Sequence, residues 1–213
     1  MQPPGRRLGK FYPDYIIRGI SDINPLDLDD GISAILLDYD NTVTGFGEEI
    51  KEPEREALER LGEAGIDLFV VTNAHASRIN TIIENLTGLI DPENIINPEC
   101  CTDTRISSIM AEKPSSKMIR YALGKHSLEA SQVLLVGDRI FNDIIAGNRA
   151  GVRTALVSPL GREHAAVEYF QRPVESLLRA MWDLPVNAED FPRTLTPTPP
   201  QNEVWYNSVE PIR

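Results

Sequence analysis

The sequence predicts an α/β fold, a doubly wound parallel sheet with helices on both faces. Short apolar runs recur along the chain without alternating polar residues, as expected for strands that are covered on both sides. Stretches of helical character lie between these runs, and such alternation is typical of a parallel sheet. The predicted strands cover residues 32–37, 66–71, 94–97, 132–137 and 152–157.

The predicted helices occupy the intervals between these strands. In residues 52–65, Pro53 and several acids suit a first helical turn, and Gly65 suits a left-handed C-terminal cap. Three further helices are predicted over residues 75–86, 115–126 and 140–151. Residues 186–213 are rich in Pro and Thr and lack periodicity, which is typical of a flexible or surface-bound tail.

Composition limits the class of protein. The 213 residues, 41% of them hydrophobic, suffice for one domain with a substantial core. The net charge of −11 disfavours binding to nucleic acid, which requires clustered cations. The sequence has no apolar run of membrane-spanning length, and residues 1–15 lack the apolar region of a secretory signal, so none is expected. Its two cysteines, Cys100 and Cys101, are adjacent. A reducing, cytoplasmic setting is expected.

Acidic residues stand where the first predicted strand ends. Asp38 and Asp40 follow the apolar run 32–37 directly. Two carboxylates at the mouth of a buried strand cost desolvation and mutual repulsion, so a positive group is expected beside them. Alone, this pair is also compatible with a turn or a helix cap.

Other polar residues follow the later strands. Thr72 and Asn73 end the second strand, Asp138 and Asp143 follow the fourth, and Lys113 precedes a helix. Because ligands of open α/β sheets bind outside the carboxyl ends of the strands, these side chains are expected to converge there. Asp143 is also compatible with a simpler role as a first-turn acid that the helix dipole favours.

Such a cluster suits a divalent cation and a phosphate. Mg²⁺ prefers oxygen ligands and is commonly held by carboxylates together with a substrate phosphate. One Asp can attack phosphorus to give an aspartyl-phosphate, and a second can act as general acid and base. A lysine, a hydroxyl and helix N-termini would stabilise the phosphoryl oxygens.

The motifs "DYDNT", "VVTNA", "KP" and "GDRIFND" resemble, in this order, those of the haloacid dehalogenase (HAD) superfamily of Mg²⁺-dependent phosphatases. The resemblance implies that Asp38 is the nucleophile and a metal ligand. It implies that Asp40 is the general acid/base and binds metal through its backbone carbonyl. Thr72, Asn73 and Lys113 would bind phosphate. Asp138 and Asp143 would complete the metal site.

Longer stretches, among them "FYPDYIIRGISDI" and "FQRPVES", are similar to the YqeG-like group of subfamily IIIA. That group includes phosphatidylglycerophosphate phosphatases, so this lipid is an expected substrate, with a soluble sugar or nucleotide phosphate as the alternative. The chain departs from the group in a longer segment at residues 87–112 and in its Pro-rich tail. The expected organisation is an N-terminal arm (1–30), a HAD-like phosphatase domain (31–185) and the tail (186–213).

The short connection at residues 43–53 leaves room for a flap and predicts no large cap domain. An open site suits a large substrate, a membrane-presented one with peripheral contact, or closure by a second subunit of a homo-oligomer.

Two other classes of protein stay open as alternatives, a receiver-like phosphoacceptor and an inactive HAD-fold binding protein. A receiver carries its lysine at the end of the last strand, where "ALVSPLG" has none.

Overall fold

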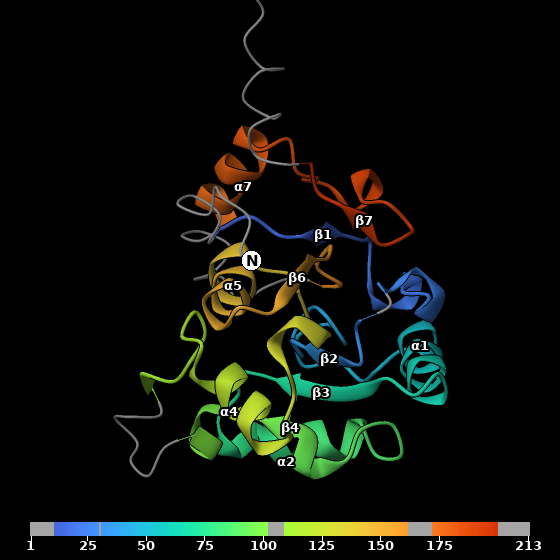
Figure 1. Ribbon diagram of the computed structural model, residues 1–213, viewed down its shortest axis with the longest axis vertical. Coiled ribbons are helices and arrows are strands. Elements are labelled where there is room, and N and C mark those ends of the chain that lie inside the picture. Colours follow the sequence, from blue (N-terminus) through green and yellow to red (C-terminus); the bar gives the residue numbers. More distant parts are fainter. Residues whose placement is uncertain (1–10, 30, 102–108, 162–171, 200–213) are drawn as a thin grey trace, which may run out of the picture.

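The structure is a computed structural model that describes residues 11–29, 31–101, 109–161 and 172–199. Its central sheet has the strand order β4-β3-β2-β5-β6-β1-β7, and in Figure 1 these strands are stacked from β4 near the bottom to β7 near the top. All neighbouring strands are parallel except β7, which is antiparallel to β1. The strands are β1 (Tyr15–Ile16), β2 (Ala34–Leu37), β3 (Asp67–Val71), β4 (Ile95–Ile96), β5 (Val133–Gly137), β6 (Arg153–Leu156) and β7 (Thr196–Pro197).

Helices connect these strands as the sequence predicts. The α-helices are α1 (Glu52–Glu63), α2 (Ala76–Asn85), α4 (Lys117–Lys125), α5 (Ile145–Ala150) and α7 (Arg172–Met181). A π-helical turn, η6 (Ile140–Ile144), precedes α5. Short 3-10 turns are η1 (Ile20–Asp22), η2 (Pro25–Asp27), η3 (Pro92–Asn94), η4 (Pro98–Cys101), η5 (Ala130–Gln132) and η7 (Ala188–Asp190). The five predicted strands and four predicted helices are confirmed within a few residues.

Alternate residues of the central strands enter two separate cores. On one face, Ile35 and Leu37 of β2 join a cluster that includes apolar residues of α1 and α2. On the other face, Ala34 and Leu36 join a cluster with α4 and α5. Because side chains alternate along a strand, a sheet covered on both faces needs a continuous apolar run. The doubly wound architecture is confirmed.

The sheet has a topological switch point between β2 and β5. From β2 the chain proceeds outward through β3 and β4, then returns to the other side of β2 with β5 and β6. The connections on either side of this point lie on opposite faces, which opens a crevice at the carboxyl ends of β2 and β5. Asp38 and Asp138 follow these two strands directly.

The segment before β2 contributes to the core. Ile17, Ile20 and Ile23 are fully buried in the cluster that contains α1 and α2. β1 pairs with β6, and β7 from the Pro-rich segment pairs with β1. The division into arm, domain and tail stays a prediction, but parts of the first and last segments belong to the same sheet.

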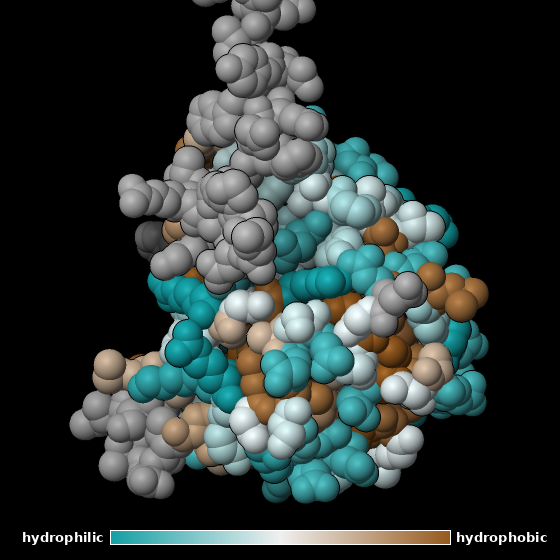
Figure 2. Space-filling view, viewed as in Figure 1, coloured by the Kyte–Doolittle hydropathy of each residue, from teal (hydrophilic) through white to brown (hydrophobic). Residues whose placement is uncertain are grey.

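Helix α7, which the sequence did not predict, follows β6 in the chain and is at the upper left of Figure 1. Its Leu178 packs against the apolar cluster that also contacts Ile16 of β1 and contains Leu156 of β6. Among the helices that the structure describes, none has the length and apolar character of a membrane span. On the face shown in Figure 2, polar residues cover most of the surface and apolar ones are visible between them.

The buried isoleucines of the N-terminal segment provide a test of its role. Ile20→Ala removes a fully buried side chain from the core. We expect it to lower the free energy of unfolding by about 2–5 kcal/mol, measured by urea denaturation. Leu26→Ala is the matched control, since Leu26 is 89% exposed in the same segment. Equal stability of the two variants would show that this segment is not part of the cooperative fold.

Candidate active site

Asp38 is the first residue after β2 and is buried, with 4% of its surface exposed. Its backbone N–H donates to the carbonyl of Val136 on β5 at 2.9 Å, which continues the parallel pairing past the end of the strand. Its Oδ1 accepts a hydrogen bond from the ammonium of Lys113. Its Oδ2 is buried and has no hydrogen-bond partner among the residues that the structure describes.

Lys113 is the cation that the sequence predicted beside the acids. Its side chain is buried, and its Nζ donates to both Asp38 and Asp143, at 2.7 Å to Oδ1 of the latter. The side-chain amide of Asn73 holds the lysine backbone, since its Oδ1 accepts from Lys113 N at 2.7 Å and its Nδ2 donates to Lys113 O at 3.1 Å. In this structure Asn73 therefore positions Lys113, and its predicted contact with phosphate stays a prediction.

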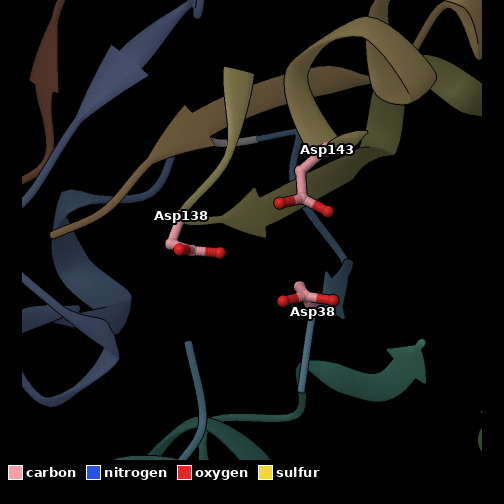
Figure 3. Close-up of side chains that lie close together, drawn as sticks. All are labelled: Asp38, Asp138 and Asp143. Atoms are coloured by element: carbon pink, nitrogen blue, oxygen red, sulfur yellow. The ribbon is translucent and has the colours of Figure 1, made fainter. Parts of the chain in front are cut away.

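The fourth motif brings two further carboxylates to the same place. Asp138 and Asp143 are fully buried, and η6, which contains Asp143, turns its carboxylate back toward the end of β5. Oδ2 of Asp143 accepts from the backbone N–H of Arg139 at 3.1 Å. One carboxylate oxygen each from Asp38, Asp138 and Asp143 lies within 4.8 Å of the others. Figure 3 shows the three groups facing a common space.

Gly137, the last residue of β5, makes this convergence sterically possible. A Cβ atom at this position would overlap the side chain of Asp143. The glycine is thus required by the close approach of a carboxylate.

Burial dominates the electrostatics of the cluster. It raises the pKa of Asp38 to about 6, with a further contribution from the charge of Asp143, while Lys113 opposes the rise. Burial acts to lower the pKa of Lys113, but the charges of Asp143 and Asp38 outweigh it, so that this pKa is raised. The lysine consequently stays protonated at neutral pH and compensates part of the negative charge.

The donor set fits a hard divalent cation. Three buried carboxylates lie beside two cations, the ammonium of Lys113 and the guanidinium of Arg139. The Nε of Arg139 is 3.8 Å from Oδ1 of Asp138. The carboxylates outnumber these cations, and Oδ2 of Asp38 lacks a partner among the described residues. All of the candidate ligands are oxygens, which Mg²⁺ and Ca²⁺ prefer.

Asp40 is not part of this three-carboxylate cluster. Its carboxylate accepts two hydrogen bonds from Arg78 of α2, at 2.9 and 2.7 Å. Thr72 is buried at the end of β3, and its Oγ1 accepts from Ala74 N at 3.0 Å. The backbone carbonyl through which Asp40 was expected to bind metal stays a predicted ligand.

The turn after Asp40 is compact. The carbonyl of Tyr39 accepts hydrogen bonds from the backbone N–H groups of Thr42, Val43 and Thr44, and Asn41 takes a left-handed conformation with φ of 65°. The hydroxyl of Thr42 is buried without a partner among the described residues. Thr42 was missed as a candidate although it ends the "DYDNT" motif; its orphaned hydroxyl directs attention to it.

Two buried side chains of helix α7 hydrogen-bond to the backbone of the fourth motif, "GDRIFND". Arg179 is buried and donates to the carbonyl of Asp138 at 3.0 Å and to that of Pro185 at 3.0 Å. Glu175, also buried, accepts from the backbone N–H of Phe141 at 3.0 Å. These two side chains fix the loop that carries Asp138, and sequence reasoning did not find them.

Cys100 and Cys101 are free thiols. Burial raises the pKa of Cys101 to about 11, which keeps its thiol protonated at neutral pH.

Fold and site define an α/β protein with a carboxylate and lysine centre at the switch point of its sheet. A family model of haloacid dehalogenase-like hydrolases matches residues 39–157. The chain belongs to this family and is therefore a hydrolase.

Relatives of known name agree with this assignment. The chain is 27% identical over 168 residues to "Probable phosphatase YqeG" of Bacillus subtilis (strain 168), covering 78% of this chain and 87% of the relative. It is 28% identical over 156 residues to phosphatidylglycerophosphate phosphatase 1 of Arabidopsis thaliana, covering 71% of this chain but 42% of the plant protein.

The solved structure of NagD from E. coli K-12 has the same fold, with a TM-score of 0.51 at 15% identity. The match covers 65% of this chain and 92% of the NagD chain.

Gly137→Ala tests whether the close approach at the end of β5 matters. The new methyl group must displace Asp143, so we expect a loss of about 1–3 kcal/mol in the free energy of unfolding, measured by urea denaturation. Gly124→Ala in α4 is the matched control, because its Cβ would meet no atom within 4 Å. That control should be neutral or stabilising. A Gly137→Ala protein as stable as the wild type would contradict the packing described.

Proposed function

We propose that the chain is a Mg²⁺-dependent phosphatase that hydrolyses a phosphomonoester through an aspartyl-phosphate on Asp38. The observation that carries this proposal is the environment of the two oxygens of the Asp38 carboxylate. One of its oxygens is bound by Lys113, the other has no partner among the described residues, and Asp138 and Asp143 lie beside it. A carboxylate in this setting has an oxygen with which to attack phosphorus.

The first step forms a bond between an Asp38 oxygen and phosphorus and breaks the bond from phosphorus to the leaving oxygen. Asp40 enters this step protonated: one of its oxygens gives up its hydrogen bond from Arg78 and donates its proton to that leaving oxygen. In the second step Asp40 takes a proton from a water molecule, whose oxygen attacks the phosphorus and releases Asp38 and inorganic phosphate. Each step conserves charge and protons within the two carboxyl groups, the substrate and water.

The remaining residues stabilise the transferred group. Lys113 would neutralise charge on the phosphoryl oxygens. The hydroxyl of Thr72 accepts from Ala74 N, so its own hydrogen can be donated to a phosphoryl oxygen. Asn73 contributes by holding Lys113 and was also predicted to bind phosphate directly.

The carboxylates of Asp38, Asp138 and Asp143, with the backbone carbonyl of Asp40, would hold Mg²⁺. When bound, the ion supplies positive charge that offsets the repulsion between the phosphate and these acids. The buried position of the acids supports a tightly held cation, since charges act more strongly where water is excluded.

The proposed substrate is phosphatidylglycerophosphate, with a soluble sugar or nucleotide phosphate as the alternative. The name of the plant relative and the short connection of residues 45–51 between the Asp40 turn and α1 support a large substrate. The proposed setting is cytoplasmic, with membrane contact no more than peripheral. A second subunit could close the open site. The inactive binding protein and the receiver-like phosphoacceptor are distinguished from this enzyme by turnover.

Asp38→Asn is the central test of mechanism. The amide is a poor nucleophile, so release of p-nitrophenol from p-nitrophenyl phosphate should fall to the background rate. Asp40→Asn should lower kcat by about 10²–10⁴-fold, the usual size of general acid–base catalysis. EDTA should abolish wild-type activity, and added Mg²⁺ should restore it. Full activity of Asp38→Asn would end the assigned mechanism.

A substrate comparison tests the proposed lipid. We expect a higher kcat/KM for phosphatidylglycerophosphate in mixed micelles than for glucose 6-phosphate or AMP, measured as phosphate release. If a soluble phosphate is turned over efficiently and the lipid is not, phosphatidylglycerophosphate is ruled out as the substrate. That result would not contradict the proposed mechanism.

A further inference from the structure

Arg78 is a cation beside the proposed general acid that the mechanism does not use. It lies in the first turn of α2, and its two terminal nitrogens donate to the two carboxylate oxygens of Asp40 at 2.9 and 2.7 Å. Its Cζ also lies 4.7 Å from the centre of the Phe46 ring. The paired hydrogen bonds and the ring contact fix the plane of the guanidinium.

The guanidinium keeps donors for a ligand. It carries five N–H groups, and Asp40 accepts from two of them. Its side chain is 35% exposed, so part of it is open to a solute. Lys113, in contrast, is buried and is engaged by Asp38 and Asp143. Arg78 is therefore an accessible cation next to the proposed reaction centre.

Its position relative to Asp40 indicates which part of the substrate it would meet. If Asp40 protonates the leaving oxygen, the leaving group lies next to Asp40, and Arg78, which is bonded to both oxygens of that carboxylate, is then close to the leaving group. The net charge of −11 repels anions over most of the surface. A second anion in the leaving group would therefore need a local cation, and Arg78 provides one.

Phe46 adds an apolar surface next to the guanidinium of Arg78. Phe46 is 47% exposed, and its backbone N–H donates to Oδ1 of Asn41 at 3.3 Å. The carbonyl of Asn41 accepts from Leu160 N at 2.9 Å, which ties this turn to the segment after β6. The ring thus stands on an anchored turn and can contact the carbon skeleton that joins a phosphate to a second anion.

We propose that Arg78 and Phe46 form a subsite for a second anionic group on the leaving part of the substrate. The substrate class is a phosphomonoester that also carries a carboxylate or a phosphodiester. Both a soluble metabolite and a lipid headgroup have this chemistry. The inference rests on the proposed phosphatase function, because Asp40 must face the leaving group.

Two matched substrate pairs test the subsite. The soluble pair is 2-phosphoglycolate and 2-hydroxyethyl phosphate, which differ in the carboxylate. The lipid pair is phosphatidylglycerophosphate and phosphatidic acid in the same micelles, which differ in the glycerol phosphodiester. For each pair, the ratio of the two kcat/KM values measures the preference for the second anion. The pair that the wild type prefers more strongly identifies the source of the substrate.

Arg78→Ala should lower that ratio by about 10- to 100-fold in the preferred pair, mainly through a higher KM for the two-anion substrate. If the substitution acted only by disturbing Asp40, it would change kcat/KM for both substrates of a pair by the same factor. That effect would cancel in the ratio. Arg78→Lys keeps the charge without the planar fork and should lose less of the preference. Arg78→Gln replaces Arg78→Ala if thermal denaturation shows that the alanine variant is unfolded.

Lys51→Ala is the matched control for loss of a positive charge. Lys51 is 60% exposed at the N-terminus of α1, where it pairs with Glu48, and its removal should leave the ratio unchanged. A ratio unchanged in Arg78→Ala, with p-nitrophenyl phosphate still hydrolysed, would overturn the subsite alone. Absence of turnover for every phosphomonoester in the wild type would overturn the proposed function and this inference with it.

Discussion

The ammonium of Lys113, buried between the carboxylates of Asp38 and Asp143, is the interaction on which the site depends. Removing three charges from water costs several kcal/mol for each ion, and mutual attraction compensates only when the geometry is good. Here the three residues come from segments far apart in the sequence. The compensation therefore exists only in the folded chain, where Asn73 fixes the lysine backbone from both sides.

The sheet supplies this geometry through its topology. The switch point lies between β2 and β5, so Asp38 and Asp138 leave neighbouring strands at the mouth of one crevice. The π-helical turn η6 then brings Asp143 back over Gly137, a position at which a side chain would overlap it. Such turns are frequent at functional sites because they redirect one residue without ending the helix. The fold thus concentrates negative charge at one edge, where an oxygen of Asp38 has no hydrogen-bond partner within the described part of the chain.

The sequence predicted what local pattern and strand-end position determine, namely the central strands, their helices and the polar residues at the carboxyl edge. It did not predict α7, although residues 172–181 have a helical periodicity of apolar residues. The burial of Glu175 and Arg179 against the Asp138 loop depends on tertiary contacts that no local pattern encodes. β1 and β7 have two residues each, too few for a periodic signal. The pairing of Arg78 with Asp40 depends on how α2 meets β2, which no local motif encodes.

The central claim is that a carboxylate oxygen of Asp38 carries the phosphoryl group during turnover. Borohydride reduces an acyl phosphate to an alcohol, so rapid quenching of the working enzyme with borohydride would convert an aspartyl-phosphate to homoserine. Peptide mass spectrometry should then find homoserine at position 38 in the presence of substrate and Mg²⁺, and none without substrate. Turnover with position 38 unmodified, or with homoserine at position 40, would contradict the account.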